Sequence, residues 1–252
     1  MLLLIDIGNT RIKWTMSSGD TLDPPQAATH ADWDNAECMR AFGALPRPDA
    51  VWVSNVGGER IGTIVRDCSR ACWGLEPNFA QSTREAAGVR NAYTDVWKLG
   101  VDRWLSMIAA YAEYRCAVCI VSIGTAATFD AVDDGGQHLG GLIIPGPQLM
   151  VSSLLENTSG IAVRAASGST GEDLFADNTL GAIQQGAVHA VAALAERMVE
   201  RVSTRLGHPP QLVFTGGASS NVVPLIRCPH VVRADLVLRG LAILARSEGR
   251  SA

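Results

Sequence analysis

Residues 6–13 read Asp6-Ile7-Gly8-Asn9-Thr10-Arg11-Ile12-Lys13 and follow an apolar run that begins at Leu2. The apolar run predicts a strand, the glycine and its polar neighbours a tight turn, and the alternation after them a second strand. Such a turn suits phosphate, because glycine lets backbone N–H groups approach, Asn and Thr add donors, and a strand-end carboxylate can hold Mg²⁺. The sequence therefore predicts an opening hairpin whose turn handles phosphate.

Two other predicted strands also end in small polar turns. Residues 117–123 lead into Gly124-Thr125-Ala126, after which residues 128–132 form a second strand that carries Asp130. Residues 212–214 lead into Thr215-Gly216-Gly217. Ordinary turn chemistry explains each turn alone, but the three together favour a binding site for a nucleoside triphosphate. The chain has no Walker A sequence and no GxGxxG after a strand, so a P-loop or Rossmann site has no support.

Strands and helices alternate along the chain, which is typical of an α/β fold. Residues 50–56 form another predicted strand. Apolar residues at helical spacing predict helices over residues 61–72, 101–114, 179–205 and 236–246. The 252 residues suit two lobes, and the strand, turn and strand of the N-terminus recur from residue 117. We therefore expect two domains, residues 1–115 and 116–252.

Composition bounds the partners and the location. The chain is 47% hydrophobic, has a net charge of −4 and contains no stretch in which basic and aromatic residues alternate. No apolar run approaches the roughly 20 residues that cross a bilayer, so we expect a cytoplasmic protein without nucleic-acid or membrane partners. The six cysteines are expected to be reduced. Cys116 and Cys119 lie at an odd spacing in a predicted strand and point to opposite faces, which disfavours a zinc site.

Six motifs in sequence order resemble those of the type III pantothenate kinases. This family belongs to the acetate kinase, sugar kinase, Hsp70 and actin superfamily and includes the Bvg accessory factor proteins. The motifs span residues 6–217: Asp6-Ile7-Gly8-Asn9-Thr10-x-x-Lys13, Leu99-Gly100-Val101-Asp102-Arg103-Trp104, Gly124-Thr125-Ala126-x-Thr128-x-Asp130, Gly140-Gly141-x-x-x-Pro145-Gly146, Asn178-Thr179-x-x-Ala182-Ile183-x-x-Gly186 and Thr215-Gly216-Gly217. The resemblance implies two ribonuclease-H-like, actin-like ATPase domains that flank a nucleotide cleft. It also implies transfer of the γ-phosphoryl group of ATP to the primary hydroxyl of pantothenate, the first step of coenzyme A synthesis.

The resemblance also implies roles for individual residues. The ATP phosphates would be bound by Asp6, Ile7, Gly8, Asn9, Thr10, Arg11, Ile12, Lys13 and Thr125. Pantothenate would be bound by Tyr93, Gly100, Val101, Asp102, Arg103 and Thr179. Asp102 would be the general base that takes the proton of the acceptor hydroxyl, a contribution of typically about 10²–10⁴ in rate.

Each assignment has a simpler alternative. Asp102 could serve only as the cap of the helix that follows it. Arg103, whose planar fork suits a carboxylate, could be an exposed helix charge. Lys13 could face solvent, and Tyr93 could be an ordinary buried or interface tyrosine.

Cations and partners complete the expectations. Mg²⁺ would be held by Asp6 and Asp130. The family's monovalent-cation site, for K⁺ or NH₄⁺, has Ser122 where many members have Asp, so dependence on that cation is an open question for this chain. By resemblance the protein would be a homodimer, with the helix over residues 179–205 as a candidate interface. The alternatives to a pantothenate kinase are a superfamily kinase with another acceptor and an accessory protein with weak turnover.

Overall fold

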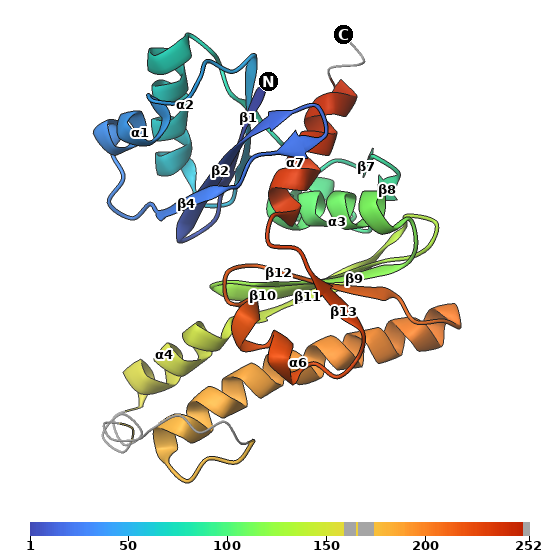
Figure 1. Cartoon of the computed structure of the whole chain (residues 1–252). Helices are drawn as coiled ribbons and strands as arrows, with labels where there is room; N and C mark the ends of the chain where they lie inside the picture. The colour runs from blue at the N-terminus through green and yellow to red at the C-terminus, as the bar shows by residue number, and fades with distance from the viewer. Residues whose placement is uncertain (159–164, 166–173, 249–252) are drawn as a thin grey trace. The chain divides into compact units, whose positions relative to one another are not determined.

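The computed structural model describes residues 1–158, 165 and 174–248 of the chain and forms two compact units (Figure 1). The first unit consists of residues 1–115 and 136–138 and of the described residues from Asp235 onward. The second consists of residues 116–135 and of the described residues between 139 and 234. The expected division into domains of residues 1–115 and 116–252 stays a prediction.

The first unit is built on one mixed sheet. Its strands are β1 (Leu2–Ile7), β2 (Arg11–Ser18), β3 (Thr21–Leu22), β4 (Gln26–Thr29), β5 (Ala50–Asn55) and β6 (Asn78–Phe79), and a separate pair is formed by β7 (Glu85–Ala86) and β8 (Val89–Arg90). The order is β3-β2-β1-β5-β6, and β4 also pairs with β2. Strand β1 runs antiparallel to β2 and parallel to β5. The predicted opening hairpin is confirmed.

Helices cover both faces of this sheet (Figure 1). They are α1 (Asn35–Phe42), α2 (Glu59–Trp73), α3 (Val101–Tyr114) and α7 (Leu236–Glu248), with a 3-10 turn at Val96–Lys98. Leu3, Ile5 and Ile7 of β1 enter the core formed with α1 and α2. Leu4 enters a second core formed with α3 and α7. Because side chains alternate along a strand, Asp6 points to the α3 side of the sheet.

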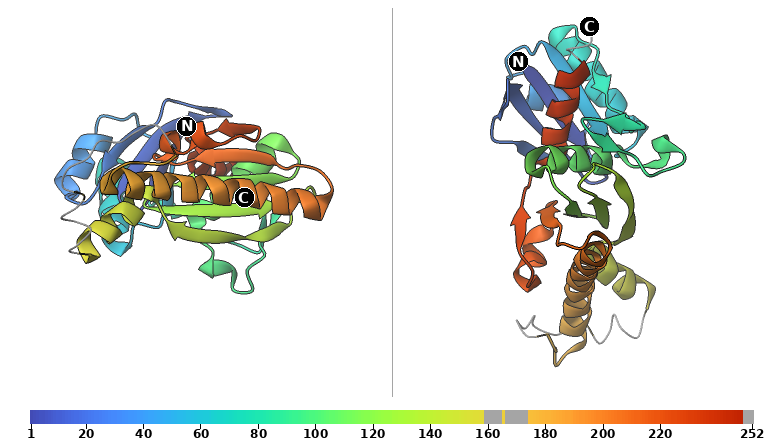
Figure 2. Two further views of the ribbon diagram at one scale, coloured as in Figure 1. Left: turned by 90° about the horizontal axis from the view of Figure 1, so that it is seen from below. Right: turned by 90° about the vertical axis from the view of Figure 1, so that its right-hand side faces the viewer.

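The second unit repeats the strand plan of the first. Its elements are β9 (Val118–Ile123), β10 (Ala126–Val132), β11 (His138–Pro145), α4 (Pro147–Asn157), α6 (Thr179–Leu206), β12 (Gln211–Thr215), β13 (His230–Val232) and 3-10 turns at Ser219–Asn221 and Val223–Leu225. The sheet order is β11-β10-β9-β12-β13. Strand β9 pairs antiparallel with β10 and parallel with β12, as β1 does with β2 and β5. Helix α6 runs along one face of this sheet (Figure 2).

The predicted strands and helices are confirmed within a few residues of their expected ends. The periodicity did not predict α1, α4, β3, β4, β6, β7, β8, β11 and β13, and most of these elements are short. The N-cap of α1 is Asp34, whose side chain accepts a hydrogen bond from the Glu37 N–H at 2.8 Å. None of the described helices combines the length and apolar character that crossing a bilayer requires.

Candidate active site

Asp6 lies at the carboxyl end of β1 beside two polar neighbours. Lys13 faces it across the β1–β2 register, and Ser54 holds the matching position on β5. The Oδ1 atom of Asp6 is buried and has no hydrogen-bond partner among the residues that the structure describes. Burial, reinforced by the negative charge of Asp102 and opposed by Lys13, raises the pKa of Asp6 from 3.8 to about 6. A buried carboxylate oxygen without a hydrogen-bond partner costs free energy. A bound cation or a cation-bound water would give this oxygen a partner.

Asp102 lies in the first turn of α3, where the free N–H groups of the helix favour a carboxylate. The N-cap residue is Gly100, so Asp102 does not cap this helix. A Cβ atom on Gly100 would lie 2.7 Å from Oδ1 of Asp102, and glycine therefore leaves room for the carboxylate. Because the charge of Asp102 acts on Asp6, the predicted base and the predicted phosphate turn share one electrostatic environment.

The turn between β1 and β2 is closed by the Gly8 N–H, which donates to the Arg11 carbonyl at 2.9 Å. Asn9, Thr10 and Arg11 are exposed. Ile7 and Ile12 are completely buried and anchor the two ends of the turn in the core. The turn thus presents three exposed polar side chains, and phosphate binding by them stays a prediction.

Behind this turn lie His30 and Arg60, which sequence reasoning missed. His30 is buried, and its Nε2–H donates to the Gly8 carbonyl at 2.7 Å. Arg60 donates to the carbonyls of His30, Ala31 and Trp33 at 2.7 to 3.0 Å. The two side chains fix the position of the turn. Neither lies at a spacing from Gly8 that would have signalled the contact.

Tyr93 and Arg103, both predicted to bind pantothenate, are in contact. The Arg103 Nη1 donates to the Tyr93 hydroxyl at 3.1 Å, and its guanidinium lies 5.8 Å from the centre of the ring. Arg103 is buried, so it is not an exposed helix charge. Gly100 is partly buried before α3, and Val101 packs into the core formed with α7.

The second predicted turn, Gly124-Thr125, joins β9 and β10 in the second unit. The Gly146 N–H donates to the Thr125 carbonyl at 2.8 Å. A Cβ atom on Gly146 would lie 2.1 Å from the Gly124 carbonyl oxygen, and one on Gly216 would lie 2.3 Å from that of Ile123. Glycines of two other motifs therefore pack directly on this turn and leave Thr125 exposed.

Ser122 and Asp130 lie on the face of the second sheet that points away from α6. Ser122 is in register with Thr128 on β10 and Thr215 on β12, so hydroxyl-bearing residues flank it on both sides. Asp130 is 2% exposed. Asp6 belongs to the first unit and Asp130 to the second. A shared Mg²⁺ stays a prediction.

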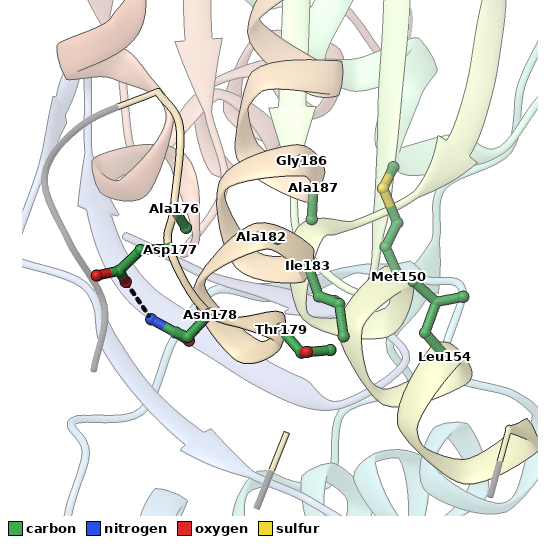
Figure 3. A pocket seen from close by; sticks show the side chains of 10 residues that line it. All are labelled: Met150, Leu154, Ala176, Asp177, Asn178, Thr179, Ala182, Ile183, Gly186 and Ala187. Atoms are coloured by element: carbon green, nitrogen blue, oxygen red, sulfur yellow. Dashed lines mark hydrogen bonds between the residues drawn. The ribbon is translucent and has the colours of Figure 1, made fainter. Parts of the chain in front are cut away.

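Thr179 is the first residue of α6, after the N-cap Asn178, whose side chain accepts from the Gly181 N–H at 2.8 Å. It lines a groove of about 760 Å³ between α4 and α6. Met150 and Leu154 of α4 line one wall of the groove, and Ile183 of α6 lies on the other (Figure 3). The groove is mainly apolar, with polar groups at the start of α6.

All six cysteines are free thiols. Burial raises the pKa of the Cys119 thiol to about 12. No group of three or more His, Cys, Asp or Glu side chains in the described part of the chain is arranged to hold a metal ion.

Comparison with known proteins shows the family of the chain. A family model described as type III pantothenate kinase matches residues 2–201. The chain belongs to this family. A type III pantothenate kinase of Nitrosococcus oceani is 35% identical over 259 residues, which cover 99% of this chain and 96% of that protein. The predicted family, and with it the prediction of an ATP-dependent kinase, is confirmed.

Solved structures support the fold of this pantothenate kinase family member. A Baf family protein from Campylobacter jejuni, described as a transcriptional activator, matches with a TM-score of 0.61 and 21% identity over 98% of this chain and 99% of that chain. The activator of 2-hydroxyisocaproyl-CoA dehydratase from Clostridium difficile, solved with bound ADPNP, matches with a TM-score of 0.52 and 13% identity over 99% and 96%. The predicted α/β, actin-like fold is confirmed.

Proposed function

We propose that this chain transfers the γ-phosphoryl group of ATP to the primary hydroxyl of pantothenate, giving 4′-phosphopantothenate and ADP. The family match over residues 2–201 carries the proposal. Its support in the structure is the pair of carboxylates, Asp6 and Asp102, in one electrostatic environment at the phosphate turn. A fold alone does not decide function, so the acceptor rests on the family and on the residues near Asp102.

In the proposed reaction the acceptor oxygen bonds to the γ-phosphorus as the bond to the β–γ bridging oxygen breaks. Asp102 takes the proton of the hydroxyl, and ADP leaves. The exposed turn after Asp6 and the exposed Thr125 would bind phosphate oxygens. Lys13 would add a positive charge beside them.

Mg²⁺ fits the first unit, because the enclosed Oδ1 of Asp6 is an oxygen ligand without a partner among the described residues. Asp6, and Asp130 of the second unit, would hold the ion or its waters, and the ion would neutralise phosphate charge. Ser122 offers a neutral hydroxyl at the monovalent-cation position, so we propose turnover that depends weakly on K⁺ or NH₄⁺. A cytoplasmic homodimer, with α6 in its interface, remains part of the proposal.

Pantothenate binding would involve Tyr93, Arg103 and Thr179. The contact between Arg103 and the Tyr93 hydroxyl supports a shared role for the first two side chains. In this proposal the guanidinium of Arg103 pairs with the substrate carboxylate, for which its planar fork is suited. Lysine at this position would keep the charge but lose the bidentate geometry.

The test is a coupled ADP-release assay with Mg²⁺, pantothenate and a panel of other small alcohols. Asp102→Asn should lower kcat by about 10²–10⁴. The matched control is Asp67→Asn, which makes the same chemical change at an exposed position of α2. Absence of pantothenate-dependent ADP release by the wild type would favour an accessory protein, and preference for another alcohol would favour a different superfamily kinase.

A further inference from the structure

Residues 91–98, here called the Tyr93 loop, are held in place by one arginine. Arg84 Nη1 donates to the carbonyls of Asn91 and Tyr93 at 3.3 and 2.9 Å, and Nη2 donates to the Thr94 carbonyl at 2.8 Å. Three carbonyls of one loop thus converge on a single guanidinium. These three charge-assisted hydrogen bonds order the backbone of the loop.

Asn91 fixes the same loop from inside. It is 3% exposed. Its Oδ1 accepts from the Tyr93 N–H at 2.9 Å, while its Nδ2 donates to the carbonyls of Thr83 and Val96 at 3.2 and 3.3 Å. The backbone of Tyr93 is therefore fixed before any ligand binds, which leaves the orientation of its ring to other contacts.

The ring of Tyr93 is oriented by His138. The imidazole is 1% exposed and lies parallel to the phenol ring, with 6.1 Å between the ring centres and 11° between the planes. The Nδ1 of His138 accepts a long hydrogen bond, at 3.5 Å, from the N–H of Ala92, the residue before Tyr93. Arg103 meets the same phenol at its hydroxyl, at 3.1 Å. Tyr93 is thus confined by an imidazole and a guanidinium.

A glycine contact brings His138 to this loop. Gly136 adopts a φ of +77°, and a Cβ atom there would lie 1.9 Å from the Gly88 carbonyl oxygen. Its own carbonyl accepts from the Arg90 N–H at 2.8 Å. Only glycine permits so close an approach of the two backbones. The segment 136–138 is therefore anchored against the β7–β8 hairpin, with His138 facing the Tyr93 loop.

We propose that His138 is a positioning residue for the acceptor alcohol: it holds the Tyr93 ring, against Arg103, in the orientation that receives pantothenate. This inference rests on the proposed function, in which Tyr93 and Arg103 bind pantothenate. His138 acts through Tyr93 and has no part in the transfer of the phosphoryl group. Its loss should weaken acceptor binding and leave nucleotide binding unchanged.

Steady-state kinetics test the role of His138 in binding. An aromatic pair is worth enough that His138→Ala should raise the KM for pantothenate about 3- to 10-fold, with kcat and the KM for ATP within about twofold. His138→Phe keeps a flat ring against Tyr93 and should return the KM to within about twofold of the wild type. The control is His208→Ala, since His208 is exposed and pairs with Asp134 in the second unit. Equal effects on both KM values, or no rescue by Phe, would overturn the proposal.

Fluorine NMR tests the positioning without any turnover. The chain has three tyrosines, so 3-fluorotyrosine labelling gives three signals, and Tyr93→Phe identifies the one from Tyr93. His138→Ala should shift that signal and leave the other two in place, because a ring-current source is removed. An unmoved Tyr93 signal would overturn the proposal even in an active enzyme. If His138→Ala shifts the Tyr93 signal but the wild type does not phosphorylate pantothenate, the positioning by His138 stands and the proposed function is rejected.

Discussion

Replacing Asp6 by Asn should stabilise the apo protein at neutral pH while it abolishes turnover. The folded protein holds the Asp6 proton more tightly than the unfolded chain, because burial and the charge of Asp102 raise its pKa. Ionisation of Asp6 therefore costs stability. That cost is absent below about pH 4 and fully present above about pH 6. Asn has nearly the same shape and carries no charge at any pH.

The size of the effect follows from the pKa. A rise from 3.8 to about 6 corresponds to about 3 kcal/mol of unfolding free energy at pH 8. Asp6→Asn should recover most of it, which for a chain of this length is an increase in Tm of roughly 5 to 10 °C. The gain should shrink as the pH falls and vanish near pH 4. Turnover should still fall, because the amide cannot hold a cation as a carboxylate does.

Urea unfolding of the ligand-free protein at a series of pH values from 4 to 8 measures this gain. Asp67→Asn is the control, since the same change at an exposed site should leave the pH dependence unaltered. If Asp6→Asn were less stable than the wild type at pH 8, or more stable by the same amount at every pH, the buried charge would not be the cause. An active Asp6→Asn variant would refute its role with phosphate or cation.

Three further changes test other parts of the structure. Gly216→Ala should lower the unfolding free energy by more than about 2 kcal/mol, measured in urea, because its φ is +89° and a Cβ would lie 2.3 Å from the Ile123 carbonyl oxygen; a neutral effect would contradict this. His30→Ala should raise the KM for ATP about tenfold with little change for pantothenate, since it removes the 2.7 Å hydrogen bond to the Gly8 carbonyl; an effect on pantothenate alone would reject its role at the turn. Ser122→Asp should make ADP release respond more strongly to K⁺ than it does in the wild type, at constant ionic strength, and a variant with only the weak response of the wild type would place the cation elsewhere.

The sequence predicted those elements that depend on local periodicity. The alternation after Gly8 and after Thr125 produced both hairpins, because each strand buries one face and its turn needs small residues. Helices α2, α3 and α6 followed from apolar spacing around whole turns. The motif order then identified the family, which composition alone could not have done.

Contacts between residues that are distant in sequence could not be predicted from local periodicity. Helix α7 packs with α3 in the first unit so closely that a Cβ on Gly240 would lie 2.0 Å from the Leu105 carbonyl oxygen. The spacing of apolar residues in the two helices does not predict this close packing. His30 and Arg60 donate to backbone carbonyls far from them in sequence. His138 lies against the ring of Tyr93. No local sequence pattern predicts these contacts. The pKa of Asp6 likewise depends on Asp102, which is distant in sequence.

The most direct test of the central claim follows the phosphoryl group itself. With ATP labelled at the γ-phosphate and enzyme in excess, the wild type should move the label onto pantothenate in a single turnover and release one ADP for each product. Asp102→Asn should bind both substrates but slow this transfer by about 100-fold or more. Label released as inorganic phosphate, label retained in ATP, or full transfer by Asp102→Asn would contradict the assignment of a pantothenate kinase with Asp102 as its base.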